Sequence, residues 1–513
     1  MDASRVDETI LTERLDAEFY RPAFLRNESM LLGLPKSNTV GGVADKVKLG
    51  YTGPIDSYYG ATGALFLTSK NLAEGKVEVG EDTERIRLEV HNGVLASTQA
   101  RAGDLLLSRT GTVGKAAVLH DKDESYNFAA HLFAVRLKNG VDADFLAAFF
   151  NSKPGRLQSE RMQRGTIIQG LSIYDIPGMR VPEPPCAVQI YIGDKVRQAE
   201  RLRVFASEKN SKIIRGSTIP EIDEALAFKE SKSNRVSCHR VNADRLDSKY
   251  YAIKQEEVLR VCSKHSDCNI ADLNPAVSNG FEERGFVESG LSYITVSELA
   301  TGRLDLSNSP KIDVLSVVPA KAKIDSCCVL VARSGSIGTA VKVHQRHSHA
   351  VISSHLIRLR FENEYQAIAV AAFLNSSAGN CLMWKISYGA VQSQIGQDEL
   401  LSLPIPNVVL LNQQQLLECW NQRENSIEIA QSLVAAAKLL VEALIERKLT
   451  EDELIHAQTC LERGDDRADR AILSRLFERG LDATVTRPLF PDLDAYYETL
   501  RMVVLEQTEV AAK

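Results

Sequence analysis

The sequence predicts an α+β protein made of two copies of one domain, each copy followed by a long helix, with a helical extension at the C-terminus. Three observations lead to this prediction. Motifs recur in the same order 224 to 231 positions apart, short β-type runs alternate with glycine turns in each copy, and apolar residues recur every seven positions after the second copy. A period above about 200 residues is too long for a solenoid, so a whole domain is duplicated.

The internal repeat rests on three pairs of motifs. Residues 14–20 (RLDAEFY) recur as 245–251 (RLDSKYY), residues 107–116 (LSRTGTVGKA) as 331–340 (VARSGSIGTA) with four identities, and residues 147–155 (AAFFNSKPG) as 371–379 (AAFLNSSAG) with six. The offset falls from 231 to 224 and then stays constant, so the length changes lie in the first half of each copy. Each copy is therefore expected to fold alone.

Within each copy, short strands come first and a helical stretch follows. The predicted strands lie at 64–68, 104–108 and 132–137 in the first copy, and at 292–296, 328–332 and 356–360 in the second. Helical stretches are predicted at 143–164 and 364–385.

Prolines end each copy, at 181–185 and 403–406, and fit the entry to a long helix. The apolar residues that recur every seven positions predict that the two helices form a coiled-coil-like pair, and we also expect these residues to form a subunit interface: Ile192, Ala199, Ala206 and Ile213 in the first helix, and Trp420, Ile427, Val434 and Val441 in the second. Each helix leaves an equivalent domain, so the pair should be antiparallel. About 30 residues of helix would hold the domains about 45 Å apart.

This interpretation divides the chain into five segments. They are 1–182 (first domain), 183–232 (first spacer helix and linker), 233–406 (second domain), 407–449 (second spacer helix) and 450–513 (helical extension). For the extension, the simplest reading is a helical hairpin packed on the spacer helix or on a partner.

Composition and charge exclude several classes of protein. The chain has 513 residues and a formal net charge of −6, which excludes a polycationic coat for nucleic acid but permits a local basic face. Its nine cysteines are scattered, which fits a reducing compartment. The polar start of the chain and the lack of an apolar run of about 20 residues predict a cytoplasmic protein without a membrane segment.

The glycine motif at 108–115 resembles a phosphate-binding loop but fails its pattern. Arg109 stands where the first glycine belongs, Ala116 replaces the required Ser or Thr, and the second copy has Thr339 in place of Lys115. We therefore predict a strand, a tight turn and a strand, with the glycines in special backbone conformations. The repeated Arg109 and Arg333 are better candidates for function.

Histidines and cysteines do not form a metal or catalytic pattern. His344, His347 and His349 are interpreted as solvated loop residues, as is the group of Cys262, His265 and Cys268, and no metal site is predicted. His131 and His355 do repeat, and we interpret them as structural because no nucleophile or paired carboxylate repeats with them. An enzyme that uses these two histidines is the least favoured alternative.

A basic segment lies between Lys153 and Arg180, where five basic residues face two acidic ones. Arg161 and Arg164 in this segment suit contacts with phosphate, next to a loop at 165–172 suited to readout. The second copy places Lys385, Gln392 and Gln394 in the equivalent stretch, and glutamine can read adenine edges. A solvated helix face is the alternative interpretation.

Taken together, these motifs resemble those of the specificity (S) subunits of type I restriction-modification systems. The resemblance rests on Arg14-Leu15-Asp16 with Phe19-Tyr20, the glycine motif at 108–115, residues 149–152 leading to Gly165 and Leu171-Ser172, the proline exit at 181–185, and residues 438–446 of the last helix. It covers about residues 10–449, in the family's order and in duplicate. The extension and the modestly acidic charge depart from the pattern, which leaves a related phage-defence complex open.

The resemblance implies a non-catalytic subunit with two target-recognition domains. Each domain would read one half of a split double-stranded DNA sequence, and the spacer helices would set the gap. The partners implied are two methyltransferase subunits, which would supply S-adenosylmethionine and base methylation, and a restriction or translocase subunit. No cofactor is expected in this chain.

The DNA-contacting residues predicted in this way are Arg109, Thr110, Thr112, Lys115, Arg161, Arg164, Gln169, Arg333, Ser334, Ser336, Lys385, Gln392 and Gln394. The alternative function is a two-domain protein-interaction scaffold without DNA specificity. The DNA sequence, its gap length and the role of the extension do not follow from the sequence.

Overall fold

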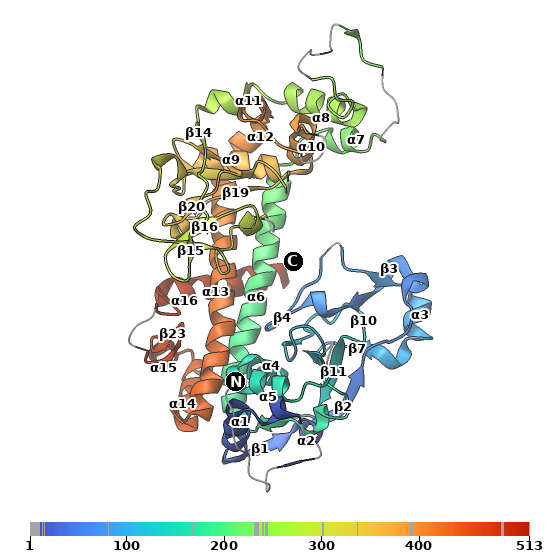
Figure 1. Ribbon diagram of the computed structural model, residues 1–513, viewed down its shortest axis with the longest axis vertical. Coiled ribbons are helices and arrows are strands. Elements are labelled where there is room, and N and C mark those ends of the chain that lie inside the picture. Colours follow the sequence, from blue (N-terminus) through green and yellow to red (C-terminus); the bar gives the residue numbers. More distant parts are fainter. Residues whose placement is uncertain are drawn as a thin grey trace. The chain divides into compact units, whose positions relative to one another are not determined.

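The computed structural model describes residues 11–12, 14, 16–80, 82–165, 169–229, 235–238, 241, 245–299, 302–335, 337–389, 393–483 and 487–511. The chain divides into two compact units (Figure 1). Unit 1 comprises Met1–Val204 and Ser426–Lys513, and unit 2 comprises Phe205–Asn425. The division passes through the two long helices, so each unit holds one globular domain and part of both helices. The exact bounds of the five predicted segments stay predictions.

The domain of unit 1 contains two four-stranded sheets. One has the order β2-β11-β8-β9 with antiparallel neighbours, and the other has the order β6-β3-β10-β7, in which β3 and β10 are parallel. Their bounds are β2 Ala44–Leu49, β11 Leu132–Leu137, β8 Leu105–Ser108, β9 Ala116–Val118, β6 Arg85–Ile86, β3 Tyr59–Leu67, β10 Tyr126–Phe128 and β7 Gln99–Ala100.

The domain of unit 2 repeats the order of the first sheet, whereas its second sheet shares three strands with that of unit 1 (β17-β16-β20 for β6-β3-β10) and differs in the fourth. Its sheets have the orders β14-β21-β18-β19 and β15-β17-β16-β20, and again one pair, β16 with β20, is parallel. Their bounds are β14 Ala276–Asn279, β21 Leu356–Arg360, β18 Cys328–Ala332, β19 Ala340–Lys342, β15 Phe286–Val287, β17 Lys311–Ile312, β16 Leu291–Ile294 and β20 Val351–Ile352. Most of the strand positions predicted from the sequence agree within one or two residues.

The smaller elements complete each unit. Two-stranded sheets pair β1 Ser37–Thr39 with β12 Arg180–Pro182, β13 Cys268–Asn269 with β22 Pro404–Ile405, β4 Leu72–Ala73 with β5 Lys76–Val77, and β23 Leu476–Phe477 with β24 Gly480–Leu481. The shorter helices are α1 Pro22–Leu32, α2 Val40–Val43, α3 Leu88–Asn92, α7 Ile222–Leu226, α8 Ile253–Lys264, α11 Gln397–Leu401 and α12 Asn407–Leu411.

Each predicted helical stretch is two helices rather than one. Unit 1 has α4 Ala143–Asn151 and α5 Lys153–Arg161, and unit 2 has α9 Glu364–Asn375 and α10 Ser377–Ile386. The break falls at Ser152 and at Ser376, whose backbones are extended. A Cβ on Gly155 would lie 2.2 Å from the carbonyl oxygen of Phe149, so only glycine lets α5 turn this closely against α4. Gly379 serves α10 in the same way, at 2.0 Å.

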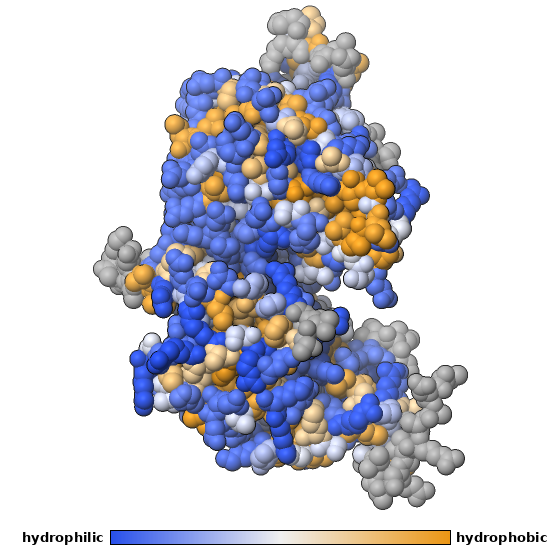
Figure 2. All heavy atoms as spheres, turned by 90° about the vertical axis from the view of Figure 1, so that its left-hand side faces the viewer, coloured by the Kyte–Doolittle hydropathy of each residue, from blue (hydrophilic) through white to orange (hydrophobic). Residues whose placement is uncertain are grey.

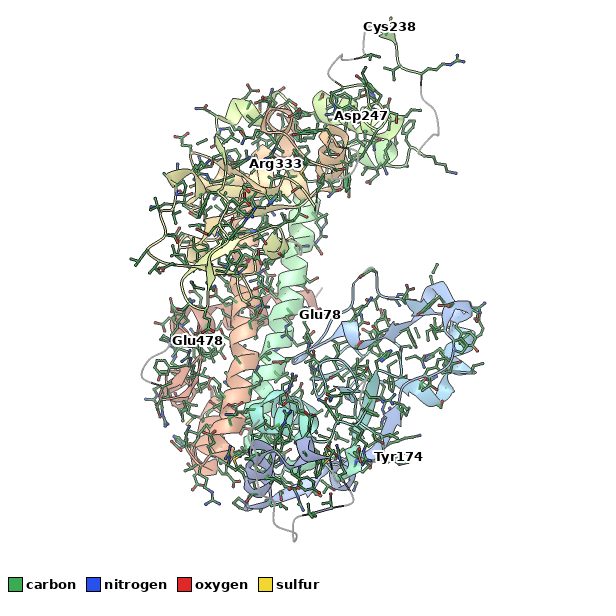
Figure 3. The ribbon with its side chains drawn as sticks, in the orientation of Figure 1. Glu78, Tyr174, Cys238, Asp247, Arg333 and Glu478 are labelled. Atoms are coloured by element: carbon green, nitrogen blue, oxygen red, sulfur yellow. The ribbon has the colours of Figure 1, made fainter. Side chains whose placement is uncertain are left out.

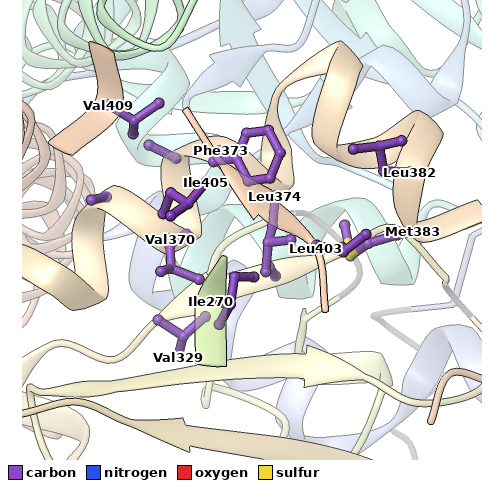
Figure 4. Packing of buried hydrophobic residues seen from close by; sticks show 14 of the residues in the cluster. Ile270, Val329, Val370, Phe373, Leu374, Leu382, Met383, Leu403, Ile405 and Val409 are labelled. Carbon is purple, nitrogen blue, oxygen red and sulfur yellow. The ribbon is translucent and has the colours of Figure 1, made fainter. Parts of the chain in front are cut away.

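The core of unit 2 is built around α9 (Figure 4). Residues 367–374 are buried without interruption because α9 packs against β18 and β19 of the sheet and against α10 and α12. Ile213, Leu416 and Trp420 of the long helices belong to this same cluster. Among the described residues no single helix is long and apolar enough to cross a membrane; α9 and α10 pass only as a pair bent by 79°.

The two long helices are α6 Cys186–Gly216 and α13 Gln413–Ile445. In unit 2, the side chain of Asn412 donates to the carbonyl of Gly216 at 2.9 Å, and Arg423 donates to Asn210 at 2.7 Å. The end of α6 therefore faces the start of α13, and within this unit the helices are antiparallel, as expected.

The apolar positions predicted as an interface are mostly buried inside the chain. Ile427 is half-buried, and the others are buried: Ile192, Ala199, Ala206, Ile213, Trp420, Val434 and Val441. Their burial within this chain corrects the prediction of a surface for another subunit, because side chains that are already packed offer no area to a partner.

Glu424 of α13 ties the helix to the domain of unit 2. Its carboxylate accepts hydrogen bonds from Arg303, Arg346 and Arg423, each at 2.9 Å. Burial alone would raise the pKa of Glu424, but the three guanidinium groups lower it to about 2. The buried carboxylate is therefore ionised and fully paired.

The neighbouring histidines are not all solvated. His349 is exposed, as predicted, but the ring of His344 lies 5.5 Å from that of Trp420, and His347 accepts a hydrogen bond from Arg346 at 3.2 Å. Burial, followed by the charge of Arg346, lowers the pKa of His347 to about 3. The prediction was wrong for these two because α13, distant in the sequence, covers their loop.

The C-terminal extension packs on α6 within unit 1. It contains α14 Glu451–Glu462, α15 Arg467–Leu473 and α16 Leu493–Ala511. The buried carboxylate of Asp469 accepts from Lys195 at 2.7 Å and from Tyr191 at 2.6 Å, and also from Tyr497 of α16. Burial raises the pKa of Asp469, but Lys195 and these hydrogen bonds lower it further, so the net pKa is below its ordinary value. The extension therefore packs on the spacer helix, which is one of the two surfaces on which the sequence predicted it to dock.

Candidate nucleic-acid interface

The glycine motif forms a turn between two strands in each domain. Turn 1 (residues 109–115) joins β8 to β9, and turn 2 (residues 333–339) joins β18 to β19. Gly111 and Gly114 have φ of 76° and 80°, conformations that favour glycine. A Cβ on Gly114 would lie 2.5 Å from the side chain of Ser159 in α5, so this glycine also permits close packing. The structural role predicted for these glycines is confirmed.

Asn151 holds the end of this turn in place. Its side-chain oxygen accepts from the backbone N–H of Ala116 at 3.0 Å, and its amide donates to the carbonyl of Ala116 at 2.7 Å. Asn375 makes the same two bonds to Ala340, at 3.2 and 2.6 Å. Two of the repeated motifs are therefore one structural device, which fixes the turn on the helix pair beneath it.

A second loop lies beside each turn. Loop 1 (residues 164–171) is closed by mutual backbone hydrogen bonds between Arg164 and Gly170, at 2.9 and 3.0 Å. Leu171 donates its N–H to the carbonyl of Arg109 at 3.0 Å, and the guanidinium of Arg109 donates back to Leu171 at 3.1 Å and to Ala130 at 3.2 Å. Arg109 thus uses its side chain to bind loop 1 to turn 1.

Loop 2 (residues 388–395) repeats the backbone contacts of loop 1, 224 positions later. Tyr388 and Gln394 exchange backbone hydrogen bonds at 2.9 and 2.7 Å, and Ile395 donates to the carbonyl of Arg333 at 2.9 Å. Figure 3 places Arg333 within the domain of unit 2. The sequence predicted a loop at 165–172 but not its place beside the turn, and the structure joins loop and turn by the same backbone bonds in both copies.

The repeated arginine at the start of each copy holds the base of the loop. The guanidinium of Arg245 donates to the carbonyls of Lys385, Ile386 and Ser387, at 3.3, 2.9 and 3.0 Å. These carbonyls end α10, where a positive charge also complements the helix dipole. Arg14 does the same at the end of α5, through Arg161 at 3.3 Å and Gln163 at 2.8 Å. Sequence reasoning found this motif by its repetition but assigned it no role.

Arg161 and Lys385 are buried and require a correction. Arg161 is 5% exposed, pairs with Glu28 at 2.6 Å and lies 4.0 Å from the centre of the Phe19 ring. Lys385 is 2% exposed, pairs with Glu256 and lies 4.0 Å from the Tyr250 ring. Both cations stack on the aromatic residue of the opening motif, so neither is offered to a phosphate. The prediction that Arg161 and Lys385 contact DNA is therefore wrong.

Arg164 lies at the surface of unit 1. Its side chain is 55% exposed but pairs through two bonds with Asp175, at 2.8 and 2.7 Å. It borders an open groove of about 1120 Å³, which turn 1 and loop 1 line on one side. The charged residues of this groove are Arg14, Arg21, Arg156, Arg161 and Arg164, with Asp16, Glu18 and Glu160. All five arginines pair with carboxylates, among them Glu28, Glu74 and Asp175, which do not line the groove.

The remaining predicted residues divide by exposure. Thr112 and Gln169 are exposed, Arg109, Thr110, Lys115, Arg333 and Gln394 are half-buried, and Ser334 is buried. Ser336 and Gln392 lie outside the described residues. Tyr174, three residues after loop 1, is 90% exposed and projects outward, and sequence reasoning missed it (Figure 3). An aromatic residue next to a predicted readout loop was the available signal.

Of the predicted loop trio, Cys262 is not solvated. It is buried in α8, and burial raises the pKa of its thiol to about 12. In the part of the chain that the structure describes, no group of three His, Cys, Asp or Glu side chains is placed to hold a metal ion.

The chain resembles known proteins in structure but matches none in sequence family. No family model and no curated protein matches the chain. Among the solved structures that are similar to it, three share 12–13% identity with the chain. They are the S subunit of a type I restriction-modification system from M. genitalium (TM-score 0.38, covering 79% of this chain and 95% of that one), the HsdS subunit from Thermoanaerobacter tengcongensis (0.27; 81% and 98%), and a structure of type I R-M complex assembly (0.25; 82% and 97%). At such low TM-scores this likeness carries no argument about function.

Proposed function

We propose that the chain is a DNA sequence-specificity subunit that recognises a bipartite target through two recognition domains. One observation carries the proposal: turn, loop and anchoring arginine recur in both units with the same backbone bonds, 224 positions apart at the turns and loops. Because the two modules share one backbone arrangement, they are suited to bind the two half-sites of a DNA target.

The side chains on this shared frame differ between the copies. Arg164 at the base of loop 1 corresponds to Tyr388 of loop 2, and Glu160 corresponds to Trp384, at the 224-residue offset. Tyr388 is 40% exposed and Trp384 is 38% exposed. Guanidinium groups can read guanine edges, whereas aromatic rings stack or contact apolar edges. The differences predict two half-sites of different sequence.

The charge of unit 1 supports nucleic acid as the ligand. Apart from the buried Arg161, four arginines and three carboxylates line the groove beside loop 1, although the whole chain is acidic. Phosphate contacts need only local positive charge. The groove therefore supports a backbone contact next to the residues proposed to read sequence.

The long helices suit the role of a spacer. On this proposal, α6 and α13 form a coiled-coil-like pair that sets the gap between half-sites and, with neighbouring surfaces, docks two methyltransferase subunits. Those subunits would bring S-adenosylmethionine and perform the methylation, and a restriction or translocase subunit would join the complex. The chain itself would be non-catalytic and act in phage defence in the cytoplasm.

The test is selection of bound sequences from a pool of random duplex DNA, together with sequencing of methylated bases in cells that express the system. We expect a motif of two short specific parts separated by an unspecific gap of constant length. Binding without any sequence preference would contradict the proposal.

A scaffold without DNA specificity is the second candidate, and one observation favours it. Figure 2 shows apolar side chains gathered on one face of unit 2. Phe286, Val314, Leu315 and Val317 are exposed by 52, 65, 84 and 93% in this unit. Exposed apolar patches of this kind are typical of protein contacts. Partner binding with no DNA selectivity would favour this function.

A further inference from the structure

A histidine and a hydroxyl group form the same pair beside each turn. Thr110 Oγ1 lies 2.9 Å from Nδ1 of His131, and Ser334 Oγ lies 3.4 Å from Nδ1 of His355. Both histidines are exposed, each directly before the central strand of its sheet, β11 or β21. The backbone is shared as well: the carbonyls of His131 and His355 accept from the N–H of Arg109 at 2.8 Å and of Arg333 at 2.9 Å.

This geometry differs from that of a buried structural histidine. The imidazole rings stand at the surface, and one ring nitrogen of each is occupied by the hydroxyl. Among the described residues, no hydrogen bond to Nε2 of either ring is found. If the hydroxyl donates to Nδ1, the proton of the neutral ring lies on Nε2, which then becomes a hydrogen-bond donor.

The repetition of the pair indicates what it contacts. Residues that are alike in both copies cannot distinguish two different half-sites, whereas Arg164 and Tyr388 or Glu160 and Trp384 can. The feature common to any two half-sites is the sugar-phosphate backbone, whose oxygens accept hydrogen bonds and carry no sequence information. A surface N–H donor next to the readout loop suits such an oxygen.

We propose that the Thr110–His131 and Ser334–His355 pairs each bind a backbone phosphate of the DNA, through Nε2 of the histidine, and so set the register of the readout loops. The proposal rests on the proposed function, because it assigns a role within DNA recognition. It assigns the repeated side chains to positioning and leaves base readout to the side chains that differ.

The test uses the full chain and the duplex it selects from the random pool. His131→Ala should weaken binding to the selected duplex and to a scrambled duplex alike, by about tenfold, the size of one hydrogen bond to a charged group. The bases selected by the variant should be unchanged. His131→Gln, which keeps an N–H donor, should recover most of the affinity. His349→Ala is the matched control, since this exposed histidine has Ser125 at its repeat position.

A chemical change in the DNA locates the contact. Single phosphates are replaced one at a time by uncharged methylphosphonates, and each duplex is measured with the unmodified chain and with His131→Ala. At one phosphate of one half-site, the replacement should lower the DNA affinity of the unmodified chain about tenfold. It should lower the affinity of His131→Ala only about twofold or less, because the methylphosphonate and the substitution remove the same hydrogen bond. His355→Ala should behave in this way at a phosphate of the other half-site.

Additive effects at every phosphate would overturn the proposal, as would a changed base preference in the His131→Ala selection. Neither result would affect the proposed function if the unmodified chain still selects a bipartite motif. A chain that selects no motif would instead refute the proposed function.

Discussion

Replacing Arg245 with alanine should loosen loop 2 while leaving the sheets of unit 2 intact. The Arg245 side chain is 10% exposed, and its guanidinium binds the three carbonyls that end α10 immediately before Tyr388. It also lies 4.3 Å from the centre of the Tyr250 ring. Without it, these carbonyls have lost their donor and α10 can fray into the loop.

The magnitude follows from the number of bonds. A hydrogen bond to a charged group contributes about 1.5–3 kcal/mol, and a cation over an aromatic ring about 0.5–2 kcal/mol. Water replaces part of this at the helix end, so we expect a local loss of about 3 kcal/mol, which is about a 100-fold change in an opening equilibrium. Arg14 binds only two such carbonyls and is 16% exposed, so Arg14→Ala should loosen loop 1 by less, about 2 kcal/mol.

Native-state hydrogen exchange measures this directly. The amides of Tyr388, Gln394 and Ile395 close loop 2, and their exchange should accelerate about 100-fold in Arg245→Ala. Amides that pair β18 with β21 serve as the internal reference and should be nearly unchanged. Arg245→Lys keeps the charge but cannot span three carbonyls, so its loop 2 amides should exchange at rates between those of the unmodified chain and those of Arg245→Ala. Equal acceleration of loop and sheet amides would refute a local role, and Arg245 would then stabilise the whole unit.

Four further results are expected. Asp469→Asn leaves Lys195 without its buried carboxylate and should lower the unfolding free energy of unit 1 by about 3–5 kcal/mol in denaturant titration, whereas Asp452→Asn at the exposed start of α14 should change it by less than about 0.5 kcal/mol. Because the pKa of Glu424 is about 2 in the folded chain and higher when unfolded, its contribution is fully present above pH of about 4.5 and is lost as pH falls through about 2; urea titration from pH 5 downward should show this slope, and Glu424→Gln should lack it. Gly155→Ala should destabilise unit 1 by at least about 1–3 kcal/mol in thermal melting, because its Cβ meets the carbonyl of Phe149, and an unchanged Tm would show that α5 can shift. Four residues inserted after Ala206 lengthen a helix by about 6 Å, so the gap in the methylated motif should grow by one to two base pairs, and an unchanged gap in an active variant would refute the spacer role.

The duplication and its strands could be read from the sequence because the repeated side chains make specific contacts that no other residue supplies. Asn151 bonds both backbone groups of Ala116, and Gly155 lies where a Cβ would meet a carbonyl. Such requirements keep the motif recognisable in both copies. The glycines of the turns are a second case, since their positive φ angles disfavour other residues.

The environment of the charged residues could not be read in the same way. Arg161 and Lys385 follow a helical pattern with polar neighbours, which is typical of a surface. They are buried by Phe19 and Tyr250, residues 142 and 135 positions away in the sequence, and local periodicity carries no information about such contacts. The break at Ser152 could have been predicted from the sequence, because Pro154 and Gly155 after it are signals of a new helix start.

The extension makes the two copies chemically unequal. Asp469 requires a cation and a phenol on the helix that it meets, and α6 supplies Lys195 and Tyr191. The positions 224 residues later are Cys419 and Gln415, which offer neither group. A second extension docked on α13 in the same way would leave a buried carboxylate unpaired, at a cost of several kcal/mol. The extension can therefore dock in this way only in unit 1. The two copies are thus chemically different, although their domains are similar.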